Sequence, residues 1–185
     1  MDTAARMSEL VETRWPHTLK QRIAAWGQGP WNDEADELEF EAHGFTCRLV
    51  RNAHMGCWCG YVALPNTHWA YGKEYSIIDD QLRRMCEDAP WCEGVPLDNV
   101  HGGLTYTAKD LPHSTRPTDR EGQWWVGFDA CHNTDLIPRY TRLGYPTPYR
   151  PNRKPLPYRT QFDMMVECGH LAMLLTDLPP PTAPD

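Results

Sequence analysis

The chain has 185 residues and carries 18 basic and 25 acidic side chains, which gives a formal net charge of −7. This length favours one domain with one hydrophobic core, so we treat residues 1–185 as a single domain. The acidic balance argues against bulk nucleic-acid binding and against a protein that coats an anionic membrane.

The chain begins with a predicted helical segment and continues into an acidic strand. Apolar residues at helical spacing predict helix over 3–26, divided at Pro16. Acids occupy most positions of 33–41, where Leu38 and Phe40 alternate with them as in a half-buried strand. We interpret this strand as a sheet edge protected by solvated charge.

A meander of three short antiparallel strands is predicted next. One strand ends near Ala42, and the others cover 45–50 and 57–64, with turns at 43–44 and 52–56. A helix follows over 76–87, and its predicted buried face consists of Ile78, Leu82 and Met85. Two further strands are predicted over 100–107 and 123–129.

The segment 137–160 is a basic strap rich in proline and tyrosine, and proline at this density favours an extended chain. Arginines and tyrosine faces suit a phosphate-bearing nucleotide or a single strand, with Arg139 and Arg150 as ligand contacts. The other interpretation is that the strap lies on the acidic segment 33–41 of the same chain.

An apolar helix is predicted over 158–176, and 179–185 is a frayed, proline-rich tail. The stripe expected to face the sheet consists of Phe162, Met165, Val166, Gly169 and Met173. The predicted fold class is therefore α+β, a mainly antiparallel sheet (a meander) with helices packed on one face.

The sequence also predicts the compartment. The start lacks a basic region followed by an apolar stretch, and no apolar run has the length of a membrane span. The seven cysteines form an odd number without framework spacing. We therefore expect a protein of the bacterial cytoplasm that has no membrane contact and no disulfide scaffold.

The first candidate site is the segment His101-Gly102-Gly103. Two glycines directly after a histidine allow the backbone to approach a neighbouring group closely, or to adopt positive φ. His101 would then be a ligand or a general base beside a loop whose amides face an anion. The alternative is a tight turn with a core histidine.

The second candidate is the end of the aromatic strand, where Asp129, His132 and Asp135 follow one another at intervals of three residues. One helical turn after the strand would bring them together as ligands of a divalent metal or as a catalytic Asp-His pair. Alternatively, Asp129 caps that turn and Asp135 is a surface carboxylate.

A third candidate is Cys59. Because Cys57 and Cys59 alternate along a strand, both could be small core residues. The sharper hypothesis makes Cys59 a nucleophile, with His101 as its base and Asp129 as the orienting acid. A four-ligand zinc ribbon is disfavoured, because the second half of such a site is missing.

These motifs, taken in order, resemble a group of small bacteriophage and prophage proteins of unassigned function. The matching segments are Cys59-Gly60-Tyr61-Val62, His101-Gly102-Gly103-Leu104-Thr105-Tyr106, and Trp124-Trp125-Val126-Gly127-Phe128-Asp129 with His132 and Asp135. The likeness covers about residues 56–136 and the C-terminal helix. The resemblance implies a phage origin and no mechanism.

We therefore expect one tryptophan-lined cleft that binds a small polar or nucleotide-like ligand, either as a binding protein or as an enzyme, in which case the reaction is hydrolysis. The catalytic candidates are His101, Asp129, His132 and Cys59. Two alternatives stay open for the cofactor: a divalent metal held by Asp129, His132 and Asp135, or hydrolysis without a metal. The expected ligand contacts are Gly102, Gly103, Tyr106, Trp69, Tyr71, Trp125, Arg139 and Arg150. The alternatives are a non-enzymatic protein that binds a host protein or sequesters a ligand, and a Cys-His-Asp thiol hydrolase.

Overall fold

A computed structural model of the chain describes residues 11–13, 18–88, 100–116, 122–144 and 156–176. The described strands form one antiparallel sheet of six strands in the order β1-β2-β3-β4-β6-β5. Their bounds are Val11–Thr13 (β1), Glu37–Ala42 (β2), Phe45–Arg51 (β3), Trp58–Pro65 (β4), Tyr106–Ala108 (β5) and Gln123–Asp129 (β6). The helices are Leu19–Trp26 (α1), Tyr75–Asp88 (α2), Pro138–Leu143 (α3) and Gln161–Thr176 (α4), with a 3-10 turn at Pro30–Asn32.

The predicted α+β fold class and the central meander are confirmed. Strands β2 and β3 are joined by His43 and Gly44, which both have positive φ (49° and 82°), as a two-residue hairpin turn requires. The β3–β4 connection is held by Asn52, whose Oδ1 accepts hydrogen bonds from the amides of His54 and Met55.

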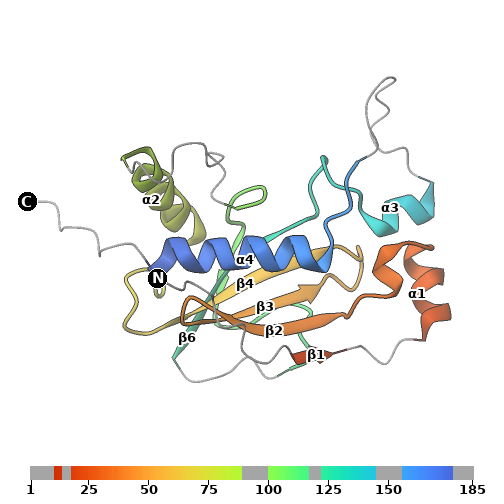
Figure 1. The fold of residues 1–185 in the computed structure, drawn as a ribbon, viewed down its shortest axis with the longest axis horizontal. Helices are drawn as coiled ribbons and strands as arrows, with labels where there is room; N and C mark the ends of the chain where they lie inside the picture. The colour runs from red at the N-terminus through yellow and green to blue at the C-terminus, as the bar shows by residue number, and fades with distance from the viewer. Residues whose placement is uncertain (1–10, 14–17, 89–99, 117–121, 145–155, 177–185) are drawn as a thin grey trace, which may run out of the picture.

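Helix α4 covers one face of the sheet, where it lies across β2, β3 and β4 (Figure 1). The main core lies beneath it, with Leu49, Trp58 and Phe128 on the sheet side and Met164 and Leu171 on the helix side. The buried side chains Ile78 and Leu82 place α2 against the same core. Helices α1 and α3 pack together at one end of the molecule.

The opposite face of the sheet carries a smaller apolar cluster of Val50, Cys59, Tyr61, Ala63 and Trp125, which is covered by Leu111 and Tyr106. Side chains alternate between the two faces along each strand. On β4, for example, Trp58 and Val62 belong to the main core and Cys59 and Tyr61 to this second cluster.

The prediction of helix over 3–26 is wrong in part. Residues 11–13 form strand β1, which pairs with β2, and helix begins only at Leu19, after the N-cap Thr18. Residues 1–10 and 14–17 lie outside the described residues. Because β1 occupies the outer side of β2, the acidic strand is not the sheet edge that the sequence predicted.

The acids that precede and begin β2 are buried rather than solvated. Asp36 is 1% exposed and Glu37 is fully buried. Asp36 Oδ1 lies 3.3 Å from Nη2 of Arg22, and Ser114 Oγ donates a 2.6 Å hydrogen bond to Glu37 Oε1. These carboxylates are therefore paired with internal arginines or accept hydrogen bonds from hydroxyls, whereas the sequence interpretation had placed them in solvent.

The expected face of the C-terminal helix is wrong in part, since only Met165 of the predicted stripe is among the side chains that pack against the main core. Phe162 and Val166 are 72% and 56% exposed, whereas Met164, Cys168 and Leu171 are fully buried. The predicted strap begins with helix α3 rather than an extended chain. Residues 145–155, which include Arg150, and the predicted tail 179–185 lie outside the described residues. No helix among the described residues has the length and apolarity needed to cross a membrane.

Candidate metal centre

His101, His132 and Asp135 come together beside the α4 face of the sheet. Nε2 of His101 lies 2.8 Å from Oδ2 of Asp135, and Nδ1 of His132 lies 3.3 Å from the same oxygen. One donor atom from each of the three residues lies within 4.8 Å of the other two. Two distant segments therefore place two imidazoles and one carboxylate around a common point.

The two glycines after His101 make this approach sterically feasible. Gly102 and Gly103 both have positive φ, and the Gly103 amide donates to the Val100 carbonyl to close a tight turn. A Cβ atom on Gly102 would lie only 2.2 Å from Cε1 of His132. The close approach predicted for this turn is therefore to the ring of His132.

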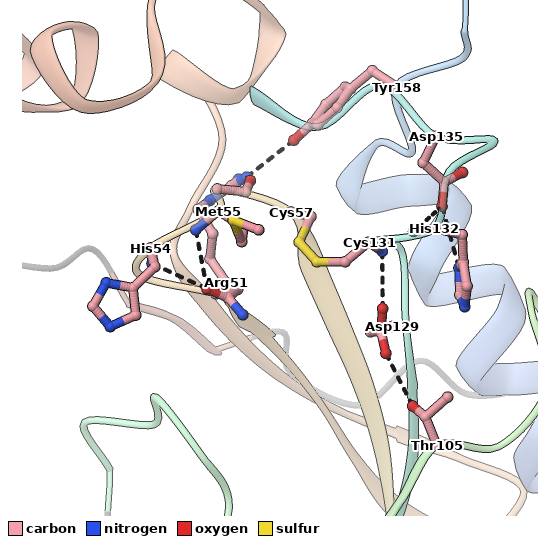
Figure 2. The surroundings of a disulfide bond; sticks show 12 residues. Arg51, His54, Met55, Cys57, Thr105, Asp129, Cys131, His132, Asp135 and Tyr158 are labelled. Atoms are coloured by element: carbon pink, nitrogen blue, oxygen red, sulfur yellow. Dashed lines mark hydrogen bonds and ion pairs between the residues drawn. A yellow bond between two sulfur atoms is a disulfide. The ribbon is translucent and has the colours of Figure 1, made fainter. Parts of the chain in front are cut away.

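The turn that carries His132 and Asp135 is fixed at its start and its end. Cys131 is joined by a disulfide to Cys57, directly before β4, and its amide donates to Oδ1 of Asp129 (Figure 2). The amide of Asp135 donates to the His132 carbonyl, and the amide of His132 donates to Oδ2 of Asp135. The Cys57–Cys131 disulfide was not expected from the cysteine spacing.

Asp135 is the charged centre of the cluster and is 3% exposed. Burial alone would raise its pKa, but the hydrogen bond and charge of His101 and the contacts with His132 outweigh burial and lower the pKa. Nε of Arg159 lies 3.5 Å from Oδ1 of Asp135. The carboxylate is therefore ionised at neutral pH and available as a ligand.

Two further residues support the cluster, and sequence reasoning did not include them in it. Glu167, on α4, accepts a hydrogen bond of 3.2 Å from the His101 amide and so holds the turn against the helix. Arg159 belongs to the predicted basic strap, but no spacing in the sequence linked it to Asp135. Both contacts depend on how α4 docks, which the local pattern does not determine.

Asp129 does not join this cluster. It lies opposite Cys59 in the β4–β6 register, and its two oxygens accept hydrogen bonds from Thr105 Oγ1 and the Cys131 amide. Directly opposed residues share a face of the sheet, so the carboxylate belongs to the face that α4 does not cover. The residues expected in one cleft therefore lie at two separate positions in the fold. Of the two interpretations of Asp129, the structure shows the one in which its carboxylate caps the turn.

Cys59 lies with Asp129 and away from the metal cluster. Burial raises the pKa of its thiol to about 12, and the nearby charge of Asp129 adds to this effect. A catalytic thiol needs a lowered pKa, because the thiolate is the nucleophile. His101, the expected base, is bonded to Asp135 instead. The arrangement required by the thiol-hydrolase hypothesis is not formed.

The expected aromatic walls are also distributed over the molecule. Trp125 is buried in the second cluster, Tyr106 packs edge-on against Tyr61, and Tyr71 lies beside Trp124. Trp69 packs partly buried against the main core. Arg139, on α3, contacts the loop after β3. Its amide donates to the Met55 carbonyl, and its Nη1 donates to the His54 carbonyl. None of these contacts places a ring or guanidinium against the metal cluster.

Comparison of the chain with protein-family models, with curated proteins and with solved structures finds no match. The resemblance to small phage proteins therefore stays a prediction, and the functional argument depends on the geometry of the side chains.

Proposed function

We propose that His101, His132 and Asp135 bind one divalent metal ion, with zinc as the preferred metal, and that the ion binds a small phosphate-bearing ligand at its open coordination position. The observation that supports this proposal is the set of three donor atoms within 4.8 Å of one another, contributed by two segments. Three protein ligands with one open position are the usual arrangement of a catalytic zinc site.

The separations of the donor atoms suit a metal of this size. Bonds of about 2.0–2.1 Å in a tetrahedron place neighbouring ligand atoms about 3.3 Å apart. The distances from Asp135 Oδ2 to the two imidazole nitrogens are 2.8 and 3.3 Å, close to this value, and all three donor atoms lie within 4.8 Å of one another, so the imidazoles would adjust their positions around the ion. Each imidazole would exchange its hydrogen bond to the carboxylate for a bond to the metal, and metal binding would release protons.

Charge and neighbouring groups favour a phosphate as the ligand. A divalent ion with two neutral histidines and one carboxylate keeps one net positive charge. Arg159 adds a guanidinium at 3.5 Å from Asp135, and its side chain is 36% exposed. Guanidinium groups match phosphate oxygens geometrically, which makes a phosphate ester a suitable ligand class.

Hydrolysis of such an ester is the reaction that this site would support. When bound, a divalent ion would act as a Lewis acid on a phosphate oxygen and would make a water molecule acidic enough to react near neutral pH. The water oxygen would add to phosphorus as the ester P–O bond breaks, and a proton of that water would pass to the leaving alkoxide oxygen. Asp135, fixed by Arg159 and the His132 amide, would keep the metal ligands oriented during this step.

Isothermal titration of the metal-free protein with zinc tests the proposal. We expect His132→Ala to weaken zinc affinity by at least about 100-fold, because one of three ligands is lost. His54→Ala removes an exposed histidine outside the cluster and should leave the affinity unchanged. Equal zinc affinities for the wild-type protein and a folded His132→Ala variant would refute the metal site.

Phosphate binding is measured separately, with inorganic phosphate added to the zinc-loaded and the metal-free protein. We expect binding only when zinc is present, and Arg159→Gln should weaken phosphate binding by a larger factor than it weakens zinc binding. Turnover of a chromogenic phosphate monoester by the zinc-loaded protein then tests hydrolysis. Phosphate binding of equal strength with and without zinc would contradict the assigned ligand class.

A glycine variant tests the close approach on which the cluster depends. Gly102→Ala should weaken zinc affinity by at least about tenfold, because the added Cβ meets the His132 ring. Gly72→Ala is the matched control, since Gly72 has the same φ of 74° and no atom within 4 Å of its added Cβ. Similar zinc affinities for the two variants would show that the ring contact does not position His132.

The interaction-protein hypothesis depended on the basic strap. Residues 145–155 of that segment, which include Arg150, lie outside the described residues, so this hypothesis stays a prediction.

A further inference from the structure

A cavity lies on the face of the sheet opposite α4, between the end of β6 and the loop that follows β5. Its volume is about 340 Å³, at the lower end of the range of roughly 300–1,000 Å³ found for small-molecule sites. The side chains that determine its chemistry are Met55, Cys59, Tyr61, Tyr106, His113 and Asp129.

Asp129 brings a negative charge into this cavity. Its Oδ1 accepts a 2.9 Å hydrogen bond from the Cys131 amide, and its Oδ2 accepts one of 3.0 Å from Thr105 Oγ1 (Figure 2). Both donors are neutral, and within the described part of the chain no ion pair is recorded for this carboxylate. A carboxylate has about four acceptor positions, so about two remain available to a ligand.

The walls of the cavity are aromatic and apolar. The rings of Tyr61 and Tyr106 meet edge to face with their centroids 5.4 Å apart. The Tyr106 hydroxyl donates to the Asp110 carbonyl, which fixes the orientation of the ring. The faces of aromatic rings carry partial negative charge and attract cations.

No lining side chain supplies a positive charge at neutral pH. Burial lowers the pKa of His113, and the neighbouring His54 lowers it further, so the imidazole is neutral. Burial raises the pKa of Cys59 to about 12, so its thiol stays protonated and neutral. Asp129 is therefore the one ionised side chain among those that line the cavity.

We propose that this cavity binds a small organic ammonium ion, with its charged nitrogen against Asp129 and its carbon substituents against Tyr61 and Tyr106. A carboxylate without a counter-charge and two tyrosine rings together favour a cation with apolar substituents over an anion or a neutral polar molecule. This site is separate from the metal centre, because none of His101, His132 and Asp135 lines the cavity.

The probes are benzyltrimethylammonium and its neutral counterpart benzyl alcohol, titrated into the full-length protein and followed by amide chemical shifts. We expect benzyltrimethylammonium to bind at least about tenfold more tightly than benzyl alcohol and to shift the signals of Thr105, Tyr106 and Cys131. Zinc removal with a chelator should leave this binding unchanged, which separates this test from that of the metal centre.

Two variants test the residues. Asp129→Asn keeps an oxygen that can accept from the Cys131 amide, and it should weaken binding of the cation at least about tenfold while leaving benzyl alcohol unaffected. Asp80→Asn, which removes an exposed carboxylate on α2 that does not line the cavity, is the matched control and should change neither. Tyr106→Leu, which keeps the cavity apolar but removes a ring, should weaken cation binding as well.

Three results would overturn the proposal. These are equal binding of the cation and the alcohol, an unchanged cation affinity in folded Asp129→Asn, or shifts that cluster away from the cavity.

Discussion

Replacing Glu34 with glutamine should destabilise the protein, because this carboxylate joins four parts of the fold. Oε2 of Glu34 accepts hydrogen bonds from Arg51 Nη2 at 2.9 Å, Tyr158 Oη at 2.6 Å and Trp58 Nε1 at 3.1 Å. Oε1 accepts a 3.0 Å bond from the amide of Gln161, at the start of α4. The carboxylate thus connects β3, β4 and α4 to the segment before β2.

The magnitude follows from the burial of Arg51, whose side chain is fully buried and stacks on Trp58 at 4.0 Å from the ring centroid. Removing one partner of a buried ion pair costs roughly 3–5 kcal/mol. Glutamine keeps one acceptor oxygen, and Asp36 Oδ1 remains 3.5 Å from Nε of Arg51. We therefore expect the free energy of unfolding to fall by about 3 kcal/mol, the lower end of that range. For a chain of this size, this corresponds to a fall in Tm of about 6–12 °C.

The effect should also depend on pH. Burial alone would raise the pKa of Glu34, but the hydrogen bonds from Tyr158, Gln161 and Arg51 outweigh it and lower the pKa below its ordinary value of 4.5. Because its pKa is lower in the folded than in the unfolded protein, ionised Glu34 stabilises the fold. This stabilisation is fully present above pH 4.5 and is lost as the pH falls through the folded-state pKa of Glu34. The difference between wild type and Glu34→Gln should shrink in that acidic window.

The assay is urea unfolding followed by tryptophan fluorescence at neutral and at acidic pH. Glu74→Gln, an exposed glutamate, is the control and should change the free energy of unfolding by less than about 0.5 kcal/mol. A loss below about 1 kcal/mol in Glu34→Gln at neutral pH, or a difference that does not shrink in acid, would refute the reasoning.

Three further outcomes are expected. Cys59 should react with iodoacetamide only after unfolding, because its pKa is raised to about 12; rapid labelling of the folded protein would contradict its burial. Reducing the Cys57–Cys131 bond should lower the free energy of unfolding by about 4 kcal/mol, since it closes a loop of 74 residues; urea unfolding with and without a dithiol reductant measures this. Phe162→Gln should change stability by less than about 0.5 kcal/mol, whereas Met164→Ala should cost about 2–5 kcal/mol, and the reverse order would contradict the observed face of α4.

The central strands could be predicted from the sequence because two local signals agree there. Alternation of apolar and polar residues indicates the strands, and the His43-Gly44 pair indicates the turn between them. The predicted bounds 45–50 and 57–64 lie within one residue of β3 and β4. These strands and this turn are determined by residues close together in the sequence, so the local sequence pattern is enough to predict them.

The N-terminal strand and the face of α4 could not be predicted in the same way. Residues 11–13 are extended because they pair with Glu37, Leu38 and Glu39, which are distant in sequence. Helix α4 has apolar residues on all sides, so its periodicity could not distinguish the buried Met164 from the exposed Phe162.

The metal centre was partly accessible to sequence reasoning. The histidine before two glycines and the His132–Asp135 spacing selected residues that the fold brings together. Asp129 was grouped with them on spacing alone, although it is the last residue of β6 and its side chain follows the alternation of that strand. The contributions of Arg159 and Glu167 depend on tertiary packing and have no local signal.

X-ray absorption at the zinc edge of the zinc-loaded protein tests the central claim most directly. The account predicts two imidazole ligands and oxygen ligands at about 2.0–2.1 Å, with one imidazole lost in His132→Ala. Sulfur ligands at about 2.3 Å, or a spectrum that His132→Ala leaves unchanged, would place the metal elsewhere and contradict the assignment of His101, His132 and Asp135.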